Sequence, residues 1–511
     1  MDQRGIKKIR RVLAGIWSML LAVCGVVVLM PSNAMKTYAA GTTNTYDVST
    51  GNVVISGCNS EDTYVISGSS TSDNVQISVP AGVTAHVVFS SLDIDVSGID
   101  DTAAVLISGA GSVEITLSGD STLKSGRHCA GLQNGNTGSL TIKGTGSLTV
   151  VGGAYAAGIG SGSQDSAGNI VISGGTVTAT GGGAGAGIGS GNYYSSVGNI
   201  TISGGNVTAT GSYSSAGIGT GNVYCSAGNI TISGGTVTAT GGSSGAGIGN
   251  GYDHCNVGNI VISGGTVQAD GGRFAAGIGC GADYNSSVAS LTICGGTVYS
   301  AGGKTASGIG DGGNSSGNLG IVISGDSQVY VSGGTDDNPY GPGAGIGGAG
   351  RNSMVPGTER GDFSGLFPTG YVKFFPAGTD TDQMKNSSIA PISVLRGTFV
   401  PARIKPQIDH MKIIEDKINA ALAQDGPQTV YIKGYDTLSL GIMELLEKNP
   451  RITLVSEFNY KGIDFKITIP GSAVKTDPSI PWYGPKYLYP NFYIYGTDTA
   501  PAFQTYLTNF S

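Results

Sequence analysis

The sequence predicts an all-β fold, a right-handed parallel β-helix with coils of about 30 residues, followed by a small α+β module. Three observations support this fold class: a recurring Gly-Ile-Gly triplet, short alternating segments on both sides of it, and a change of composition after residue 405. The steps between triplets run from 29 to 37 residues, so one structural unit is stacked on itself. The triplets start at Gly158, Gly187, Gly217, Gly247, Gly277, Gly308 and Gly345.

One repeat, Gly228–Gly251, shows the pattern of a single coil. Its apolar residues alternate with polar or small residues in three short segments, which pairs of glycine separate. Such alternation is typical of strands with one buried face, and strands this short are stable only when each pairs with its copy in the next coil. We expect a three-sided coil in which a recurring asparagine forms an internal structural ladder along the axis; its members are Asn169, Asn199, Asn229 and Asn259.

Residues 1–40 have the features of a signal peptide. A basic start is followed by an apolar run, Val12–Met30, and by small residues close to residue 40. We expect cleavage between Met35 and Thr42, and therefore a secreted, extracellular or cell-surface protein without membrane contact once the segment is removed. The apolar run is also long enough for an uncleaved anchor, and the sequence leaves that alternative open.

The charge that remains after the signal segment is acidic. The segment removes six of the 27 Lys and Arg and one of the 34 Asp and Glu, which leaves 21 basic and 33 acidic side chains and a net charge of −12. Nucleic acid is therefore not an expected partner, because phosphate binding needs clustered basic residues. Thinly spread acidity favours solubility instead.

Six cysteines remain after the signal segment, and none has the spacing of a metal site. Cys225 and Cys255 are 30 residues apart, at the same position of the repeat. Stacking would place their Cα atoms about 4.8 Å apart, which is inside the disulfide range. We predict a disulfide between them, and two unpaired thiols are the alternative.

The periodicity divides the chain into regions. Irregular coils lead into the regular repeats at about residue 151, and the composition changes again after the last triplet. The predicted linker contains Arg360-Gly361-Asp362, an integrin-type tripeptide that we interpret as chance. The predicted regions are the signal peptide, 1–40; the β-helix, 41–350, with regular repeats over 152–350; a linker, 351–405; and an α+β module, 406–511.

The last region has the mixed pattern of an α+β module. Apolar residues recur at helical spacing in two segments and alternate in three others. The module is expected to be separate from the repeats. Its predicted helices span 408–422 and 438–447, its first strand spans 429–433, and its hairpin spans 452–460 and 464–469.

Two stretches resemble known bacterial families. The first resemblance rests on SLDIDVSGIDDTAAVLISGAGSVEITLSGDSTLKSG from Ser91, on SLTIKGTGSLTVVGG and on the GNITISGGTVTATGG repeats. It is to secreted β-helix proteins described as carbohydrate-binding-domain proteins. It implies a fold like that of pectate lyases, binding of a polysaccharide or cell-wall glycan without cleavage, and calcium binding in some members. The tail from Pro427, PQTVYIKGYDTLSLGIMELLEKNP, is similar to a module of Gram-positive surface proteins and implies no activity.

Catalytic residues are not expected on the regular coils. Between Gly152 and Gly334 the only basic residues are Arg273 and Lys304, and His254 is the only histidine. We therefore expect a protein that is not an enzyme and has no cofactor apart from calcium. An acidic cluster offers oxygen ligands for that ion, a solvated edge being the alternative; its members are Asp93, Asp95, Asp100 and Asp101.

The loop after each triplet varies most and holds aromatic residues in a column. Five residues past the last glycine of the triplet, four successive coils carry a Tyr or His, and two further tyrosines lie beside this position. Tyrosine offers a sugar an apolar face and a hydroxyl, and packing of the rings on one another is the alternative. The predicted ligand-binding residues are Tyr193, Tyr194, Tyr224, Tyr252, His254 and Tyr284, with Asp165 at the same position in the first regular coil.

Together these features predict a non-catalytic, glycine-rich protein that is secreted or held at the cell surface and binds polysaccharide or acts as an adhesin. Rigid repeats that carry variable loops are a common arrangement for binding. Two other functions are compatible with the sequence. One is a structural spacer that displays the C-terminal module, and the other is a polysaccharide lyase with its site in the irregular coils.

Overall fold

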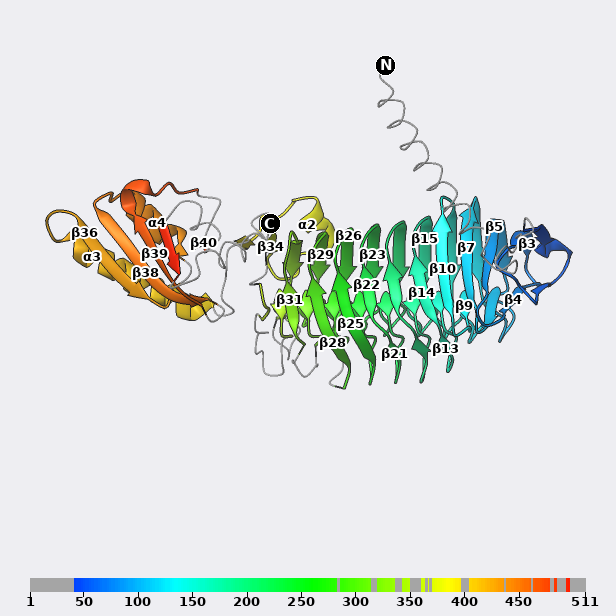
Figure 1. Cartoon of the computed structure of the whole chain (residues 1–511). Coiled ribbons are helices and arrows are strands. Elements are labelled where there is room, and N and C mark those ends of the chain that lie inside the picture. Colours follow the sequence, from blue (N-terminus) through cyan, green and yellow to red (C-terminus); the bar gives the residue numbers. More distant parts are fainter. Residues whose placement is uncertain are drawn as a thin grey trace, which may run out of the picture. The chain divides into compact units, whose positions relative to one another are not determined.

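The computed structural model shows a parallel β-helix and a C-terminal α+β module, each described by itself below (Figure 1). The predicted signal segment, 1–40, lies outside the described residues. In the described part of the chain, no helix combines the length and the apolarity needed to cross a lipid bilayer. The described residues are 41–282, 285–313, 319–335, 342–349, 360–363, 366, 370–396, 404–435, 438–460, 463–477, 482–484 and 493–496.

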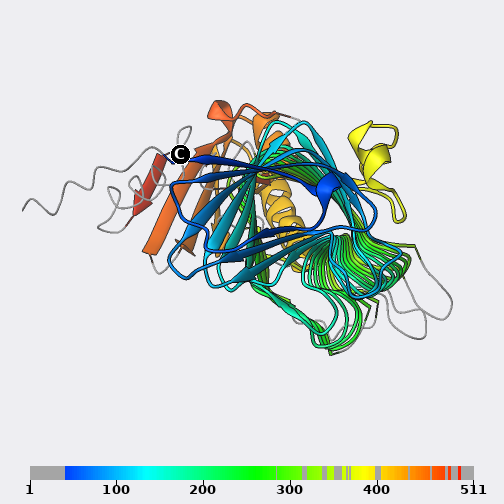
Figure 2. The ribbon, with the colours of Figure 1, turned by 90° about the vertical axis from the view of Figure 1, so that its right-hand side faces the viewer.

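Three ladders of parallel strands form the sides of the β-helix, and Figure 2 shows the coils lying over one another along the stack. The first ladder contains the Gly-Ile-Gly strands. It has eleven strands: β2 (Val53–Ile55), β4 (Val75–Val79), β6 (Val105–Gly109), β9 (Leu132–Asn134), β12 (Ile159–Gly160), β16 (Ile188–Gly189), β20 (Ile218–Gly219), β24 (Ile248–Gly249), β27 (Ile278–Gly279), β30 (Ile309–Gly310) and β33 (Ile346–Gly347).

The second ladder contains the Asn-Ile-Thr-Ile strands and begins in the irregular coils. A short helix, η1 (Val48–Thr50), follows its first strand. The ladder runs through β1 (Thr43–Asp47), β3 (Thr63–Ser70), β5 (Thr84–Asp95), β7 (Ser112–Ser118), β10 (Ser139–Gly144), β14 (Asn169–Ile172), β18 (Ile200–Ile202), β22 (Ile230–Ile232), β25 (Asn256–Ile262), β28 (Ser287–Ile293) and β31 (Ile321–Ile323).

The third ladder contains the Thr-Val-Thr-Ala-Thr strands. The third ladder runs through β8 (Asp120–Lys124), β11 (Ser147–Val151), β15 (Thr176–Thr180), β19 (Asn206–Thr210), β23 (Thr236–Thr240), β26 (Thr266–Asp270), β29 (Thr297–Ala301), β32 (Gln328–Ser332) and β34 (Tyr371–Phe374). Outside the three ladders, two-residue strands pair with one another in the loops after the triplets: β13 (Ser166–Ala167), β17 (Ser196–Val197) and β21 (Ser226–Ala227).

One continuous apolar core fills the space between the ladders. Ile188, Ile218 and Ile248 follow one another in register and are fully buried, as the alternation predicted. Each such side chain contributes about 1.5–3 kcal/mol on burial, which is small against the cost of ordering a whole coil. The coils therefore stabilise one another along the stack, and the predicted three-sided parallel β-helix is confirmed.

The last glycine of each triplet is required by the backbone and by its neighbours. Gly219 has φ of +137°, a region that other residues rarely adopt, and a Cβ atom placed on it would lie 2.0 Å from the carbonyl oxygen of Gly249. The backbone of the next coil passes directly over this position. The triplet is therefore conserved from coil to coil within the chain by close contact between backbones.

The asparagine column forms a ladder, although not the internal one that we predicted. The backbone N–H of Asn199 donates to the side-chain Oδ1 of Asn169 at 2.8 Å, and Asn229 and Asn259 repeat the bond at the same distance. The ladder lies at an exposed corner, and it joins backbone to side chain instead of amide to amide. It holds the corner because each extra backbone donor is satisfied.

The stretch predicted as a linker, 351–405, contains structured elements, so that prediction is wrong for its described part. β34 adds a parallel strand to the third ladder, and β35 (Ser393–Arg396) pairs antiparallel with β34. Between them α2 (Thr381–Lys385) begins at a capping box formed by Asp380 and Gln383. The sequence did not indicate that the β-helix continues into this stretch, because the stretch contains no Gly-Ile-Gly triplet.

The Arg-Gly-Asp tripeptide in this stretch closes the β-helix. The guanidinium of Arg360 forms an ion pair with Asp311, which is 2% exposed. Asp362 forms a parallel bridge with Val322. Both charged residues of the tripeptide are thus tied to the stack, and its role in the fold is structural.

The C-terminal module contains the predicted elements in the predicted order. β36 and β38 pair in parallel through the α4 crossover, and β38 pairs antiparallel with β39. Apolar residues of α3, α4 and the sheet share one buried core. The elements are α3 (Ile404–Leu422), β36 (Gln428–Lys433), β37 (Leu438–Ser439), α4 (Leu440–Glu447), β38 (Ile452–Tyr460), β39 (Ile463–Pro470), η2 (Gly471–Ala473), β40 (Trp482–Tyr483) and β41 (Tyr493–Gly496).

Candidate aromatic binding site

Aromatic rings stack on one another along one loop edge of the β-helix. The ring centroids of Tyr194 and Tyr224 are 5.0 Å apart with planes inclined by 7°, and those of Tyr224 and His254 are 4.6 Å apart with planes inclined by 30°. The backbone N–H of Tyr224 donates to the carbonyl of Asp253 at 2.8 Å, which holds adjacent loops in register. We call Tyr194, Tyr224 and His254 the aromatic stack.

All three residues of the aromatic stack have a left-handed backbone. φ is 53° at Tyr194, 51° at Tyr224 and 52° at His254. This conformation costs a bulky residue about 1–3 kcal/mol, whereas glycine adopts it freely. A ring pair returns about 0.5–1.5 kcal/mol. The stack contains three strained residues but only two ring pairs, so the free energy gained by stacking offsets the backbone cost only in part.

Stacking also decides which ring surfaces face solvent. Tyr224 lies between two rings, so both of its faces are covered and its edge remains. Tyr194 ends the stack, because no other ring of the described residues covers its second face, and it is 70% exposed against 44% for Tyr224. Of the two alternatives, rings that bind sugar with their faces or rings that pack on one another, the second holds for Tyr224, and a ring face is left for a sugar only at the ends of the stack.

Asp165 lies outside the aromatic stack, although its distance from the triplet predicted that it would lie in the same column. Ser166 pairs with Ser196, so Asp165 stands opposite the residue after Tyr194. One carboxylate oxygen of Asp165 accepts a hydrogen bond from Gln133 Nε2 at 3.1 Å. The error arose because the loop that carries Tyr194 has one more residue than the loop before it.

The other predicted site residues flank the stack or lie beyond it. Tyr193 and Tyr252 are exposed at 47% and 40%, and neither belongs to a ring pair within the described residues. Tyr284 lies outside the described residues. The structure thus brings together Tyr194, Tyr224 and His254 from the predicted set.

A buried column of small polar side chains supports these loops from inside. The hydroxyls of Ser195 and Ser286 donate to loop carbonyls at 2.7 and 2.5 Å. Cys225 and Cys255 lie between them in the stack, and their thiols donate to loop carbonyls at 3.1 to 3.5 Å. Hydroxyl and thiol therefore serve the same purpose, which is to satisfy the carbonyls of the turn.

The predicted disulfide between Cys225 and Cys255 is absent from the structure, which holds both as buried free thiols. The two thiols interact nevertheless. The hydrogen bond from Cys255 lowers the pKa of Cys225, and burial raises the pKa of Cys255.

The four aspartates predicted to bind calcium do not form one site. Asp95 Oδ2 lies 2.9 Å from Lys124 Nζ, and Asp101 Oδ1 lies 2.7 Å from His128 Nδ1. Within the described residues, no group of three or more His, Cys, Asp or Glu side chains is placed to hold a metal ion. The structure therefore does not support calcium ligation by the predicted set, Asp93, Asp95, Asp100 and Asp101.

A second ring contact, which the sequence did not predict, lies in the loops before the Gly-Ile-Gly strands. The rings of His128 and Tyr155 stack with centroids 5.5 Å apart and planes inclined by 17°. The guanidinium carbon of Arg127 lies 5.1 Å from the centre of the Tyr155 ring. The sequence offered little indication of this contact. The residues lie where the irregular coils meet the regular ones, and no Gly-Ile-Gly triplet precedes them to set their position in the repeat.

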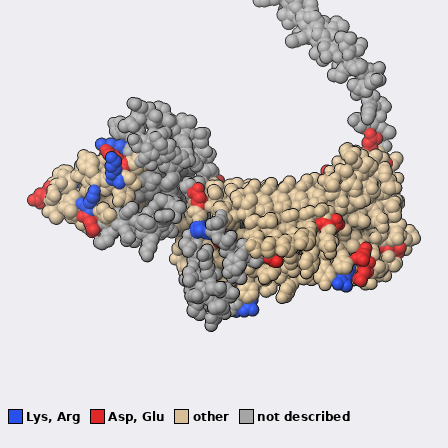
Figure 3. All heavy atoms as spheres, turned by 90° about the horizontal axis from the view of Figure 1, so that it is seen from below, with Lys and Arg blue, Asp and Glu red and all other residues tan. Residues whose placement is uncertain are grey.

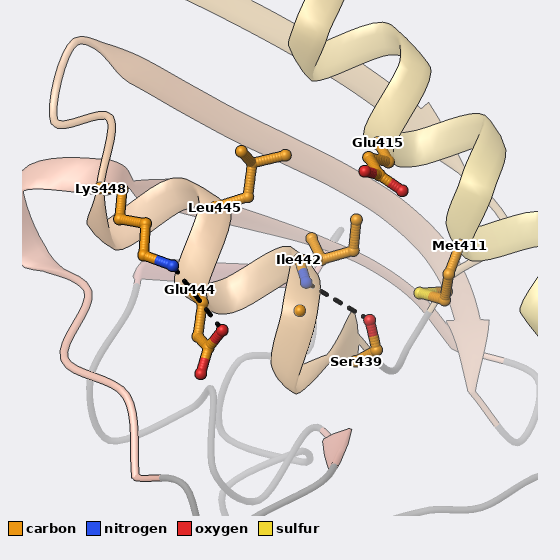
Figure 4. A pocket seen from close by; sticks show the side chains of 8 residues that line it. Met411, Glu415, Ser439, Ile442, Glu444, Leu445 and Lys448 are labelled. Carbon is orange, nitrogen blue, oxygen red and sulfur yellow. Dashed lines mark hydrogen bonds and ion pairs between the residues drawn. The ribbon is translucent and has the colours of Figure 1, made fainter.

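The C-terminal module has a small hollow between α3 and α4 (Figure 4). Its volume is about 220 Å³, and Met411, Ile442 and Leu445 supply apolar lining. Lys448 Nζ lies 3.9 Å from Glu444 Oε2, and the carboxylate of Glu415 also lines the hollow. The hollow is smaller than most ligand pockets, and its groups serve the packing of the two helices.

Comparison with known proteins agrees with this architecture. The family model described as beta helix repeat matches four segments of the chain, 170–192, 200–222, 230–252 and 260–282. No curated protein and no solved structure matched the chain. Each of the first three matched segments ends two residues before a member of the aromatic stack. The chain is therefore similar to β-helix repeat proteins in its coils, and the match does not include the residues of the stack.

Proposed function

We propose that this chain is a non-catalytic, secreted or cell-surface protein that binds a polysaccharide through the aromatic stack. The observation that carries the proposal is the placement of three aromatic residues at left-handed positions of successive loops, with Tyr194 and Tyr224 exposed and His254 half-buried. Glycine or asparagine at these positions would cost less backbone energy. The stability of the fold therefore does not by itself explain why aromatic residues occupy these positions.

The geometry suggests how a glycan chain contacts the stack. The outer face of Tyr194 packs against the C–H face of one sugar unit, and the edges and hydroxyls of the following ring contact neighbouring units. Coils repeat about every 4.8 Å, so the strip runs along the axis of the β-helix. A polymer lying along that axis meets several rings without bending, which suits a polysaccharide better than a single sugar.

A structural spacer is the second candidate function. The covered faces of Tyr224 favour it, because rings that stack only on one another also seal the loop backbone. A spacer would bind no glycan with measurable affinity. The two functions therefore differ in one observable, which is binding of polysaccharide by the purified chain.

The test compares the purified chain with a variant in which Tyr194, Tyr224 and His254 are all changed to Asn. Asn tolerates the left-handed backbone, so the fold is retained while the rings are removed. Each ring is expected to contribute about 1 kcal/mol, so we expect the variant to bind at least about tenfold more weakly on a glycan array and in titration calorimetry.

The control variant is Tyr213→Ser. Tyr213 is 73% exposed and lies in the other loop, where the next coil carries Ser243. It should bind glycan as the parent does. If the parent binds no glycan, or the triple variant binds as tightly as the parent, the rings are packing and the spacer function is favoured. Assaying for unsaturated products in the same samples tests lyase activity.

A further inference from the structure

The ring contact around Tyr155 brings together polar and aromatic groups that the proposed function does not use. Arg127 and His128 come from one coil and lie against the ring of Tyr155 in the next. His128 has φ of 71° and bonds Asp101, whose φ is 54°. Two adjoining residues with strained backbones thus fix the His128 ring against Tyr155.

Among the described residues, no ring lies beside the second face of Tyr155. The ring of His128 and the guanidinium of Arg127, which contact the Tyr155 ring, both come from the preceding coil. The backbone of Gly182 lies against Gly153 in the same way as Gly153 lies against Gly126, so Ala184 takes the position of Tyr155 in the following coil. Alanine is too small to cover a phenol ring. Tyr155 is half-buried, and the face of its ring toward the coil that carries Tyr194 is without a ring partner among the described residues.

Tyr155 adjoins the start of the aromatic stack. The backbone N–H of Asn192 donates to the carbonyl of Tyr155 at 2.9 Å, and Asn192 precedes Tyr194 by two residues. Tyr194 has its open face toward the preceding coil, and Tyr155 has its open face toward the following one. The two open faces thus belong to adjacent coils and look in opposite directions along the axis.

Carboxylates near these two faces outnumber the single guanidinium, that of Arg127, and this balance favours an uncharged ligand. Asp101 lies beside His128, Asp165 lies beside Gln133, and Asp253 lies 2.5 Å from His254. Such carboxylates accept hydrogen bonds from sugar hydroxyls and repel acidic sugars. On the face shown in Figure 3, most of the described surface of the β-helix carries no charged side chain. A polyanionic glycan would find few basic partners.

We infer that Tyr155, with Arg127 and His128 behind it, forms a second sugar subsite that extends the aromatic stack, and that the ligand is a neutral polysaccharide. The inference rests on the proposed function. One sugar unit packs on the open face of Tyr155, and another packs on Tyr194. The guanidinium of Arg127 and the carboxylate of Asp101 are exposed beside this ring contact, where they can donate to and accept from the hydroxyls of a sugar ring.

The experiment titrates four forms of the purified chain: parent, Tyr155→Ala, Tyr194→Asn and the control Tyr213→Ser. Tyr155→Ala introduces the residue that the following coil already carries, so the variant is expected to fold. The probes are hexasaccharides of β-linked glucose, xylose and mannose, with hexagalacturonate as the acidic probe. We expect Tyr155→Ala to weaken binding of a neutral hexasaccharide about five- to tenfold, by analogy with other aromatic contacts.

The outcomes test the subsite, the class of ligand and the proposed function separately. Weakening by both Tyr155→Ala and Tyr194→Asn, with Tyr213→Ser like the parent, supports the subsite. If only Tyr194→Asn weakens binding, the subsite is wrong and the proposed function stands. If hexagalacturonate binds more tightly than every neutral probe, the ligand class is wrong. If the parent binds none of the probes, the proposed function fails and this inference fails with it.

Discussion

At the scale of single residues, close contact between backbones explains the most regular feature of the sequence. The last glycine of the triplet is needed both for its φ and for the space that its missing side chain leaves. These two requirements can be separated by experiment, because the chain contains glycines that have only the first of them. Gly57 has φ of +72°, and nothing lies within 4 Å of an added Cβ atom.

We predict that Gly219→Ala lowers the free energy of unfolding by about 2–6 kcal/mol. Backbone strain accounts for about 1–3 kcal/mol of this. Overpacking against Gly249 accounts for about the same again. Gly57→Ala should cost only about 1 kcal/mol, since it adds strain without a clash. Chemical denaturation followed by circular dichroism measures both, and equal losses in the two variants would contradict the role of close packing.

The sequence predicted which residues face inward better than it predicted the candidate site. Ile218 and Ile248 follow from alternation, because a residue that points inward in one coil does so in all coils. The site depends on loop lengths, which do not repeat. Asp165 was misplaced because one inserted residue shifts the register locally, and Tyr155 was missed because its ring partners come from a coil without a triplet.

At the scale of elements, α2 explains why the threonine rows of the third ladder stop. Thr238 and Thr240 give way to Gln268 and Asp270 in the next coil. Those two side chains bond Thr381 in α2, at 2.7 Å from Gln268 and at 2.7 and 2.8 Å from the two oxygens of Asp270. The sequence change thus marks the part of this side of the β-helix that α2 covers.

We predict that Met384→Asp releases α2 while the β-helix stays folded. Met384 is 1% exposed and packs with Ala301 and Phe375, so a carboxylate there would lose its solvation. Limited proteolysis should then cut between residues 376 and 392, and the main thermal transition should change little. Lys385→Asp alters the charge of an exposed neighbour on the same helix and should stay resistant. Equal resistance of both variants would show that α2 is not held by this contact.

Elements with a strong periodicity could be predicted from the sequence, and the others could not. The helices and strands of the C-terminal module follow from apolar spacing, and the structure places them within a few residues of the predicted bounds. α2 has five residues, and its stability comes from contacts with Asp270 and Ala301, which are more than 80 residues away in the chain. No local pattern records such contacts.

At the scale of the whole molecule, the regular coils should unfold as one unit. No coil can offset its own ordering cost, so damage to one coil removes support from those beside it. We predict that Ile218→Asp abolishes folding of the β-helix, because it buries a charge without a partner in the centre of the stack. Thr208→Asp places the same charge on the outer side of a strand and should fold. A parent-like thermal transition in Ile218→Asp would contradict the continuous core.

The 30-residue spacing between paired strands has a consequence for how such a chain evolves. Strand pairing across β15, β19, β23 and β26 keeps the same spacing, so whole coils are interchangeable in the stack. Duplication or loss of 30 residues would add or remove one rung and leave every inward side chain inward. An odd number of residues added inside a strand would turn part of that strand inside out, whereas the loops absorb changes of length, as the coils of 29, 31 and 37 residues show. The gene can therefore add loops to the array one whole coil at a time, and each new loop is free to acquire its own length and residues.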